Sequence, residues 1–293
     1  MVVVFPSKVQ FTDLVVLSKP RIVLMVMLTA AAGFWMASPT GQHTLLLFNT
    51  LLGTALVAAG TNALNQVAER DLDALMRRTR MRPIPAGRLS PTVAALFAWL
   101  AGVAGIGYLA VTVNLLTAAL AAITLLSYVF VYTPLKRHSS ASTLIGAIPG
   151  ALPIVGGWTA ATGSLAFAAW ALFWIMFLWQ LPHFLALGWL YREDYARARF
   201  KLLSSGDSDG RLTFVYANLY AAALVPVSLA PTLLGLAGGV YFWGALALGL
   251  AFVALCLPAA RHIDNARARR AFLASLAYHP LWMGLLVFDT LPL

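Results

Sequence analysis

Long apolar segments alternate along this chain with short polar connections that carry the charges. Each segment is continuously apolar, and about 20 such residues suffice to cross a lipid bilayer as a helix. The pattern predicts nine membrane-spanning helices, at residues 21–38, 44–66, 92–111, 114–133, 142–161, 165–190, 212–235, 239–259 and 271–288. Segments with internal prolines, such as AIPGALPIVGG in the fifth, are expected to be kinked.

The composition supports the same interpretation. Of the 293 residues, 61% are hydrophobic and only 10% are charged, whereas soluble domains carry about 25% charged residues. The continuous apolar runs favour helices over a β-barrel, whose strands would alternate between apolar and polar positions. We therefore expect a single all-α membrane domain over residues 1–293, with residues 1–20 forming a retained N-terminal segment.

The basic residues are distributed with complete asymmetry. All 20 Lys and Arg fall in the N-terminal segment, at the first residue of the first predicted helix (Arg21), or in the connections after the second, fourth, sixth and eighth predicted helices. The positive-inside rule then predicts a multi-pass protein of the cytoplasmic (inner) membrane, with a cytoplasmic N-terminus and the C-terminus on the opposite side. Because topology accounts for the net charge of +10, we expect no nucleic-acid partner.

Residues 60–90, GTNALNQVAERDLDALMRRTRMRPIPAGRLS, place amides, acids and arginines at the end of the second helix. If that helix continues, Asn62, Asn65, Glu69 and Asp73 recur on one face, while Asp71 points elsewhere. Two interpretations remain open. The stripe is either a network of hydrogen bonds and ion pairs at a helix end, or a site where oxygen ligands hold Mg²⁺ and the following arginines bind substrate phosphate.

A second polar cluster ends the sixth helix, in WQLPHFLALGWLYREDYARARFKLLSSGD. His183, Tyr191 and Asp194 share a helix face if Pro182 leaves the register intact. Arg197 and Lys201 follow Asp194 on that face and are candidate phosphate ligands. His183 is a candidate proton carrier, substrate hydrogen-bond partner or iron ligand, and the residues alone leave these roles open. The other histidines, His279 among them, show no comparable pattern.

These segments resemble the UbiA superfamily of intramembrane prenyltransferases, and within it the branch that farnesylates haem. NQVAERDLD at 65–73 matches the superfamily motif N-x-x-x-D-x-x-x-D, with Glu69 at the middle acid. DALMRRTRMRPIPAGR at 73–88, YTPLKR at 132–137, GAIPGALP at 146–153 and PHFLALGWLYREDYARA at 182–198 are similar to the haem branch. The superfamily's second D-x-x-x-D motif is incomplete, because Ala198 stands four residues after Asp194.

The resemblance implies a UbiA-type helix bundle around a central cavity. It also implies transfer of a farnesyl group from farnesyl diphosphate to a vinyl group of haem B, with addition of water, giving haem O and diphosphate for haem A biosynthesis. Haem B is then a substrate and Mg²⁺ the cofactor. Haem A synthase or a terminal oxidase is a candidate partner in the same bilayer.

The resemblance assigns roles to individual residues. Asn65, Glu69 and Asp73 would be catalytic metal ligands, with Asp194 as an additional candidate. His183 would be catalytic and would bind haem, with Tyr191 as a second haem contact. The basic residues expected to bind the diphosphate are Arg77, Arg80, Lys136, Arg197 and Lys201.

Two other functions are compatible with parts of the pattern. A related prenyltransferase could act on a quinone precursor or a chlorophyll, although the haem-like segments argue against it. A secondary transporter could use the intramembrane polar stripe as an ion path. Transporter sites usually lie near the middle of the membrane, however, whereas these polar residues gather at one of its faces.

Overall fold

The computed structural model describes residues 10–39, 43–261 and 263–291, so residues 1–9 of the predicted N-terminal segment lie outside the described residues. The elements are α1 (Phe11–Ser18), α2 (Pro20–Ala37), α3 (Thr44–Asp73), α4 (Pro91–Thr112), α5 (Leu115–Leu126), η1 (Ser127–Tyr132), α6 (Thr133–Leu135), α7 (Ser142–Thr162), α8 (Phe167–Leu190), α9 (Arg192–Arg197), α10 (Leu203–Gly206), α11 (Arg211–Ser228), α12 (Ala230–Leu233), α13 (Gly239–Arg261) and α14 (Asn265–Phe288).

Nine helical segments in the described part of the chain are long and apolar enough to span a membrane, which confirms the predicted all-α membrane fold and its nine spans. Two boundaries of the nine spans differ from the sequence expectation by more than two residues. Helix α3 continues through the polar stretch to Asp73. Helix α14 begins at Asn265, because the Asp264 side chain accepts a hydrogen bond from the Arg267 backbone N–H, at 2.7 Å, and so caps the helix before its apolar part.

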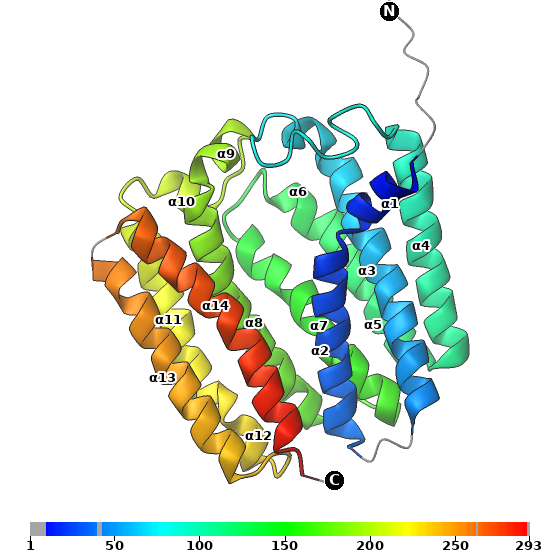
Figure 1. Cartoon of the computed structure of the whole chain (residues 1–293), viewed down its shortest axis with the longest axis vertical. Helices are drawn as coiled ribbons and strands as arrows, with labels where there is room; N and C mark the ends of the chain where they lie inside the picture. Colours follow the sequence, from blue (N-terminus) through cyan, green and yellow to red (C-terminus); the bar gives the residue numbers. More distant parts are fainter. Residues whose placement is uncertain (1–9, 40–42, 262, 292–293) are drawn as a thin grey trace, which may run out of the picture.

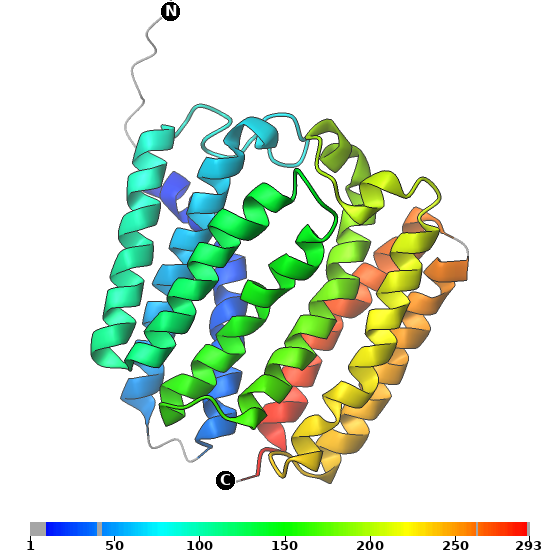
Figure 2. The ribbon, with the colours of Figure 1, turned by 180° about the vertical axis from the view of Figure 1, so that it is seen from behind.

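The long helices run side by side, alternating in direction, so that successive connections lie at opposite ends (Figure 1). The connections after α3, α6, α8 and α13 lie at the same end as α1 and α9, as the view from behind also shows (Figure 2). We call this the basic end. Every Lys and Arg in the described residues belongs to these connections, to the start of the chain, or to adjoining helical turns.

The chain enters the bundle through a sharp turn between α1 and α2. Lys19 adopts a left-handed conformation with φ of 53°, and Pro20 then begins α2, where its missing N–H costs no hydrogen bond. Two amides of α3 hold this turn in place: Asn62 Nδ2 donates to the Ser18 carbonyl and Gln66 Nε2 to the Leu17 carbonyl. The turn therefore holds the backbone of Lys19 against the polar face of α3.

Two apolar cores hold the bundle together. One is built mainly from α7, α8, α11, α13 and α14, and the other from α1, α3, α4 and α5. Helices α2 and α7 approach closely because of two glycines. A Cβ at Gly33 would lie 1.9 Å from the Ile154 carbonyl oxygen, and one at Gly157 would lie 1.9 Å from that of Ala30. Such contacts between small residues are typical of packed membrane helices.

The fourth span is not the regular helix that its hydropathy predicts. It widens into a π-helical segment, η1, between α5 and α6, a feature found frequently at functional sites. The Thr133 hydroxyl donates to the Tyr128 carbonyl five residues earlier, at 2.8 Å. This segment brings Tyr128 to the lining of the cavity described below and Thr133 into contact with α3.

Candidate active site

The polar stripe of α3 lies inside the bundle. Asn62, Asn65, Glu69 and Asp73 are all buried, and Asp73 is fully inaccessible. The side chain of Asp71 is 84% exposed and points away from the stripe. The helical spacing therefore places the four side chains as expected, and their roles in catalysis stay predictions.

Each carboxylate of the stripe is paired with a cation from another segment. Glu69 forms an ion pair with Lys136, the residue that follows α6. Asp73 Oδ2 accepts a hydrogen bond from Arg82 Nη1 at 2.6 Å. The backbone carbonyl of Asp73 also accepts from the Thr79 hydroxyl, at 2.8 Å, which folds the loop after α3 back over the helix end. Lys136 and Arg82 are thus already next to the acids.

Lys136 is enclosed as well as paired. Its Nζ lies 4.6 Å from the centroid of the Tyr132 ring and 5.4 Å from that of Phe200, within the range of cation–π attraction. Burial alone would lower the pKa of Lys136, but the neighbouring Glu69 carboxylate outweighs it and raises that pKa above its usual value. Lys136 is therefore held as a cation beside Glu69.

Lys19 is a further basic residue beside this site, which the sequence analysis did not single out. Burial, and to a lesser extent the nearby positive charges of Arg82 and Lys136, lower its pKa to about 7, while Glu69 and Asp73 act in the opposite direction. The signal that could have identified it is the pair Lys19-Pro20, which breaks the helix where the chain enters the bundle.

The oxygen atoms of the stripe are suited to a hard cation. Asn65 Nδ2 donates to the Thr133 hydroxyl at 3.1 Å, which leaves its Oδ1 as an acceptor. Asp73 Oδ1 is buried without a hydrogen-bond partner. In the described residues no three or more His, Cys, Asp and Glu side chains are grouped closely enough to hold a metal by themselves. Two carboxylates and an amide fit Mg²⁺ that takes its remaining ligands from substrate phosphate and water.

The second acidic cluster contacts the loop that follows α3, and the candidate metal role of Asp194 stays a prediction. Asp194 Oδ1 and Oδ2 accept hydrogen bonds from the backbone N–H groups of Arg77 and Arg78, both at 3.2 Å. Arg197 Nη1 donates to Asp194 Oδ1 at 2.7 Å. Asp194 therefore fixes the loop that follows α3, because each of its two oxygens accepts a hydrogen bond from that loop. Only the tertiary structure reveals this, because the partners are far apart in the sequence.

The other predicted diphosphate ligands are more exposed than Lys136 or already paired with another residue. Arg77, Arg80 and Lys201 are exposed, and the guanidinium of Arg197 is engaged with Asp194. Tyr191, a predicted haem contact, is 37% exposed at the end of α8, and its ring lies under the Arg78 guanidinium at 5.1 Å. It is not among the residues that line the cavity.

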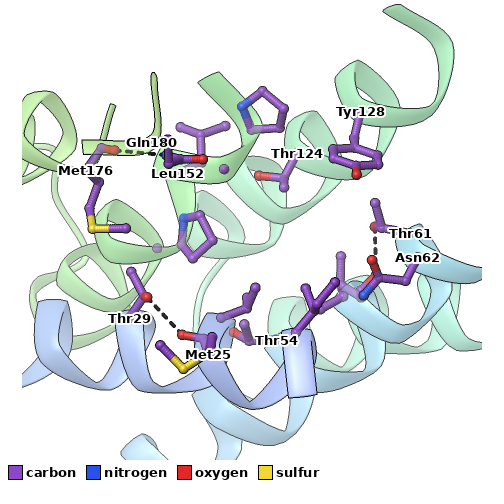
Figure 3. Close-up of a pocket in the computed structure, with 18 of the residues that line it drawn as sticks. Met25, Thr29, Thr54, Thr61, Asn62, Thr124, Tyr128, Leu152, Met176 and Gln180 are labelled. Carbon is purple, nitrogen blue, oxygen red and sulfur yellow. Dashed lines mark hydrogen bonds between the residues drawn. The ribbon is translucent and has the colours of Figure 1, made fainter. Parts of the chain in front are cut away.

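A mostly apolar cavity of about 480 Å³ lies in the bundle and reaches Asn62 of the stripe. Asn65, Glu69 and Asp73 lie closer to the basic end and do not line it. Figure 3 shows the Tyr128 hydroxyl pointing toward Thr61 and Asn62 across this space. Helix α3 therefore carries the buried charged cluster toward the basic end and lines the apolar cavity through Asn62, with Tyr128 lining the same cavity.

His183 lines the cavity from α8. The helix continues through Pro182 to Leu190, so the register is intact. The His183 ring is nearly parallel to that of Trp179, with centroids 5.7 Å apart. His279 of α14 also lines the cavity and stacks on Trp179 at 4.2 Å. The sequence showed no reason to link His279 with His183, because their helices meet only in the folded bundle.

Comparison with known proteins identifies the family. The sequence profile of the UbiA prenyltransferase family matches residues 26–281. A protoheme IX farnesyltransferase of Solibacter usitatus is 43% identical over 286 residues, spanning 94% of this chain and 98% of the relative. One from Salinibacter ruber is 46% identical over 277 residues, with the same two coverages of 94% and 98%.

Solved structures agree on the fold. A structure of digeranylgeranylglyceryl phosphate synthase has a TM-score of 0.80 at 14% identity. The match covers 95% of this chain and 97% of the synthase chain. A UbiA homologue from Archaeoglobus fulgidus bound to DMAPP and Mg²⁺ has a TM-score of 0.68 at 16% identity, covering 94% and 99%. The profile match and the identities to the two relatives show that this chain belongs to the UbiA prenyltransferase family.

Proposed function

We propose that this protein transfers the farnesyl group of farnesyl diphosphate to a vinyl group of haem B and that water adds in the same reaction, giving haem O and diphosphate. The relatives of 43% and 46% identity are protoheme IX farnesyltransferases. The observation that carries the proposal is that α3 carries a buried carboxylate–cation cluster and also lines the apolar cavity that contains His183.

At the charged end, Glu69, Asp73 and Asn65 would hold Mg²⁺, as the free acceptor atoms of Asp73 and Asn65 allow. Support for this metal comes from the Archaeoglobus fulgidus homologue, which is bound to DMAPP and Mg²⁺. Bound Mg²⁺ would neutralise charge on the diphosphate as it leaves. Lys136 and Arg82 would bind the diphosphate oxygens, since both already lie beside the acids. The other predicted diphosphate ligands would contact the diphosphate from outside this cluster: Arg77, Arg80, Arg197 and Lys201.

In the cavity, the bond between C1 of the farnesyl group and the diphosphate oxygen breaks first, and diphosphate leaves. The vinyl electrons then form a bond to C1 of the allylic cation. Water then adds to the carbocation left beside the porphyrin ring and releases one proton. The apolar lining excludes other water from the allylic cation. His183 would orient the haem through its iron, whereas Tyr191 lies outside the cavity.

We further propose that the basic end faces the cytoplasm, with the protein in the inner membrane, its N-terminus inside and its C-terminus outside. The asymmetric distribution of Lys and Arg supports this orientation. Diphosphate would then be released directly into the cytoplasm. Haem A synthase or a terminal oxidase would receive the product within the same membrane.

The test is turnover by purified protein with haem B, farnesyl diphosphate and Mg²⁺, read by mass spectrometry of the porphyrin product. We expect the mass of haem O. Prenylation of 4-hydroxybenzoate but not of haem B would instead identify a quinone-type enzyme. Movement of a solute into liposomes without chemical change would identify a transporter. Either result would overturn the proposed function.

A further inference from the structure

Ser275 of α14 faces His183 of α8 across the helix interface. Its Oγ lies 2.9 Å from His183 Nδ1 and 2.6 Å from the backbone carbonyl oxygen of Phe272. A carbonyl oxygen can only accept, so the single hydroxyl proton of Ser275 is committed to Phe272. Ser275 Oγ must therefore accept its second hydrogen bond, and His183 Nδ1 must carry the proton that is donated.

This assignment decides the tautomer of His183. A neutral imidazole has one N–H and one lone pair; with Nδ1 protonated, the lone pair is on Nε2. That atom has no hydrogen-bond partner in the part of the chain that the structure describes, and His183 lines the cavity. The neighbours of the ring fix its orientation. The centroid of the Phe272 ring lies 5.0 Å from that of His183. Trp179, which stacks on His183, is itself fixed because its indole N–H donates to the Ser275 carbonyl at 2.8 Å.

His279 offers an internal comparison. Its Nε2 lies 3.4 Å from the Thr29 hydroxyl oxygen, whose proton is donated to the Met25 carbonyl at 2.8 Å. By the same reasoning, Nε2 of His279 carries the proton and Nδ1 has the lone pair. The two histidines stack on one tryptophan, and this reasoning assigns them opposite tautomers through hydroxyls from different helices.

We propose that Ser275 is a positioning residue that holds His183 in the Nδ1-protonated tautomer, so that the Nε2 lone pair is presented to the cavity as a ligand for the iron of the acceptor. The proposal rests on the proposed function. Its physical basis is general: a histidine that binds a metal donates its other N–H to a fixed acceptor, and loss of that acceptor costs about 10- to 100-fold in affinity or activity.

The first experiment reads the tautomer without any ligand. The full chain, labelled with ¹⁵N-histidine in detergent micelles, is examined by NMR, and the His183 signals are assigned by their loss in His183→Gln. We expect Nδ1 to be protonated in the parent protein and in Ser275→Thr, and this preference to disappear in Ser275→Ala. Thr29→Val should disturb the His279 signals and leave those of His183 in place. A His183 protonated at Nε2, or unaffected by Ser275→Ala, overturns the proposal.

The second experiment reads the consequence for binding. The parent protein and Ser275→Ala are titrated with haem B and with metal-free protoporphyrin. We expect haem B to bind about 10- to 100-fold more weakly to Ser275→Ala, with little change for the metal-free ring. Equal weakening of both porphyrins would show a packing role and overturn the proposal. If the parent protein binds neither porphyrin, the proposed function and the iron-binding part fail together, while NMR still decides whether Ser275 sets the tautomer.

Discussion

Lys136 and Glu69 form a buried ion pair between two segments that are distant in the sequence. Arg82 and Asp73 form a second pair beside it. In this ligand-free arrangement, the acids of the proposed metal site are neutralised by the cations of the proposed diphosphate site. Binding of a metal diphosphate would exchange partners, with the acids turning to the metal and the cations to phosphate.

Removing one member of the first pair should destabilise the protein. Lys136→Met leaves the Glu69 carboxylate buried without its cation, which we expect to cost about 3 kcal/mol or more. Thermal unfolding in detergent measures the loss. The double variant Lys136→Met with Glu69→Gln should recover most of it, because no unpaired charge remains. Arg137→Met changes the neighbouring exposed cation and should have little effect; a loss equal to that of Lys136→Met would contradict the ion-pair explanation.

The metal site is tested by the contrast between two aspartates of one helix end. Asp73→Asn removes the charge of a buried carboxylate on the stripe, and we expect turnover to fall by about 100-fold or more, since metal stabilisation of the leaving group is worth several kcal/mol. Asp71→Asn alters an exposed side chain and should retain near-parental turnover. Equal activities in the two variants, measured over a Mg²⁺ titration, would refute the assignment of Asp73.

Asp194 should act through the loop that it clamps. Asp194→Asn weakens its hydrogen bonds to the backbone of Arg77 and Arg78. We expect faster proteolysis within residues 74–82 and a higher KM for farnesyl diphosphate. The Mg²⁺ concentration for half-maximal activity should not change. Glu193→Gln alters an exposed neighbour and is the matched control. A raised Mg²⁺ requirement confined to Asp194→Asn would instead support a metal-binding role.

The close approach of α2 and α7 predicts a sharp difference between adjacent glycines. Gly157→Ala would drive a methyl group into the Ala30 carbonyl, and overpacking of this kind costs about 1–3 kcal/mol or more. Gly156→Ala meets open space and should be tolerated, because alanine also favours the helix. Thermal unfolding of the two variants is the measurement. Equal stabilities would mean that the helices can separate at no cost.

Orientation can be tested with one thiol at a time. Cys256 is the only cysteine, so Cys256→Ala provides a background without thiols. Ser140→Cys lies at the basic end and Ser164→Cys at the other, and both positions are exposed. In intact cells, a membrane-impermeant maleimide should label Ser164→Cys, whereas Ser140→Cys should react only after lysis. The reverse result would invert the proposed topology.

Much of the fold follows from local information. Hydropathy alone places the nine spans, since a helix that must satisfy its own backbone in lipid needs a long apolar run. Hydropathy does not predict where α14 begins, because the helix starts at a polar N-cap residue, Asp264, before its apolar part. It does not predict the π-helical segment at Ser127–Tyr132 either, since nothing in a run of apolar residues distinguishes five-residue from four-residue hydrogen bonding.

The α3 stripe could be predicted because Asn65, Glu69 and Asp73 belong to one helix, and their spacing matches the helical period. Their partners could not. Lys136, Arg82 and Lys19 reach the stripe through a widened helix, a folded loop and a left-handed turn, and Ser275 reaches His183 by the docking of α14 on α8. Contacts of this kind depend on how separate segments pack against one another. No local pattern in the amino acids records that packing.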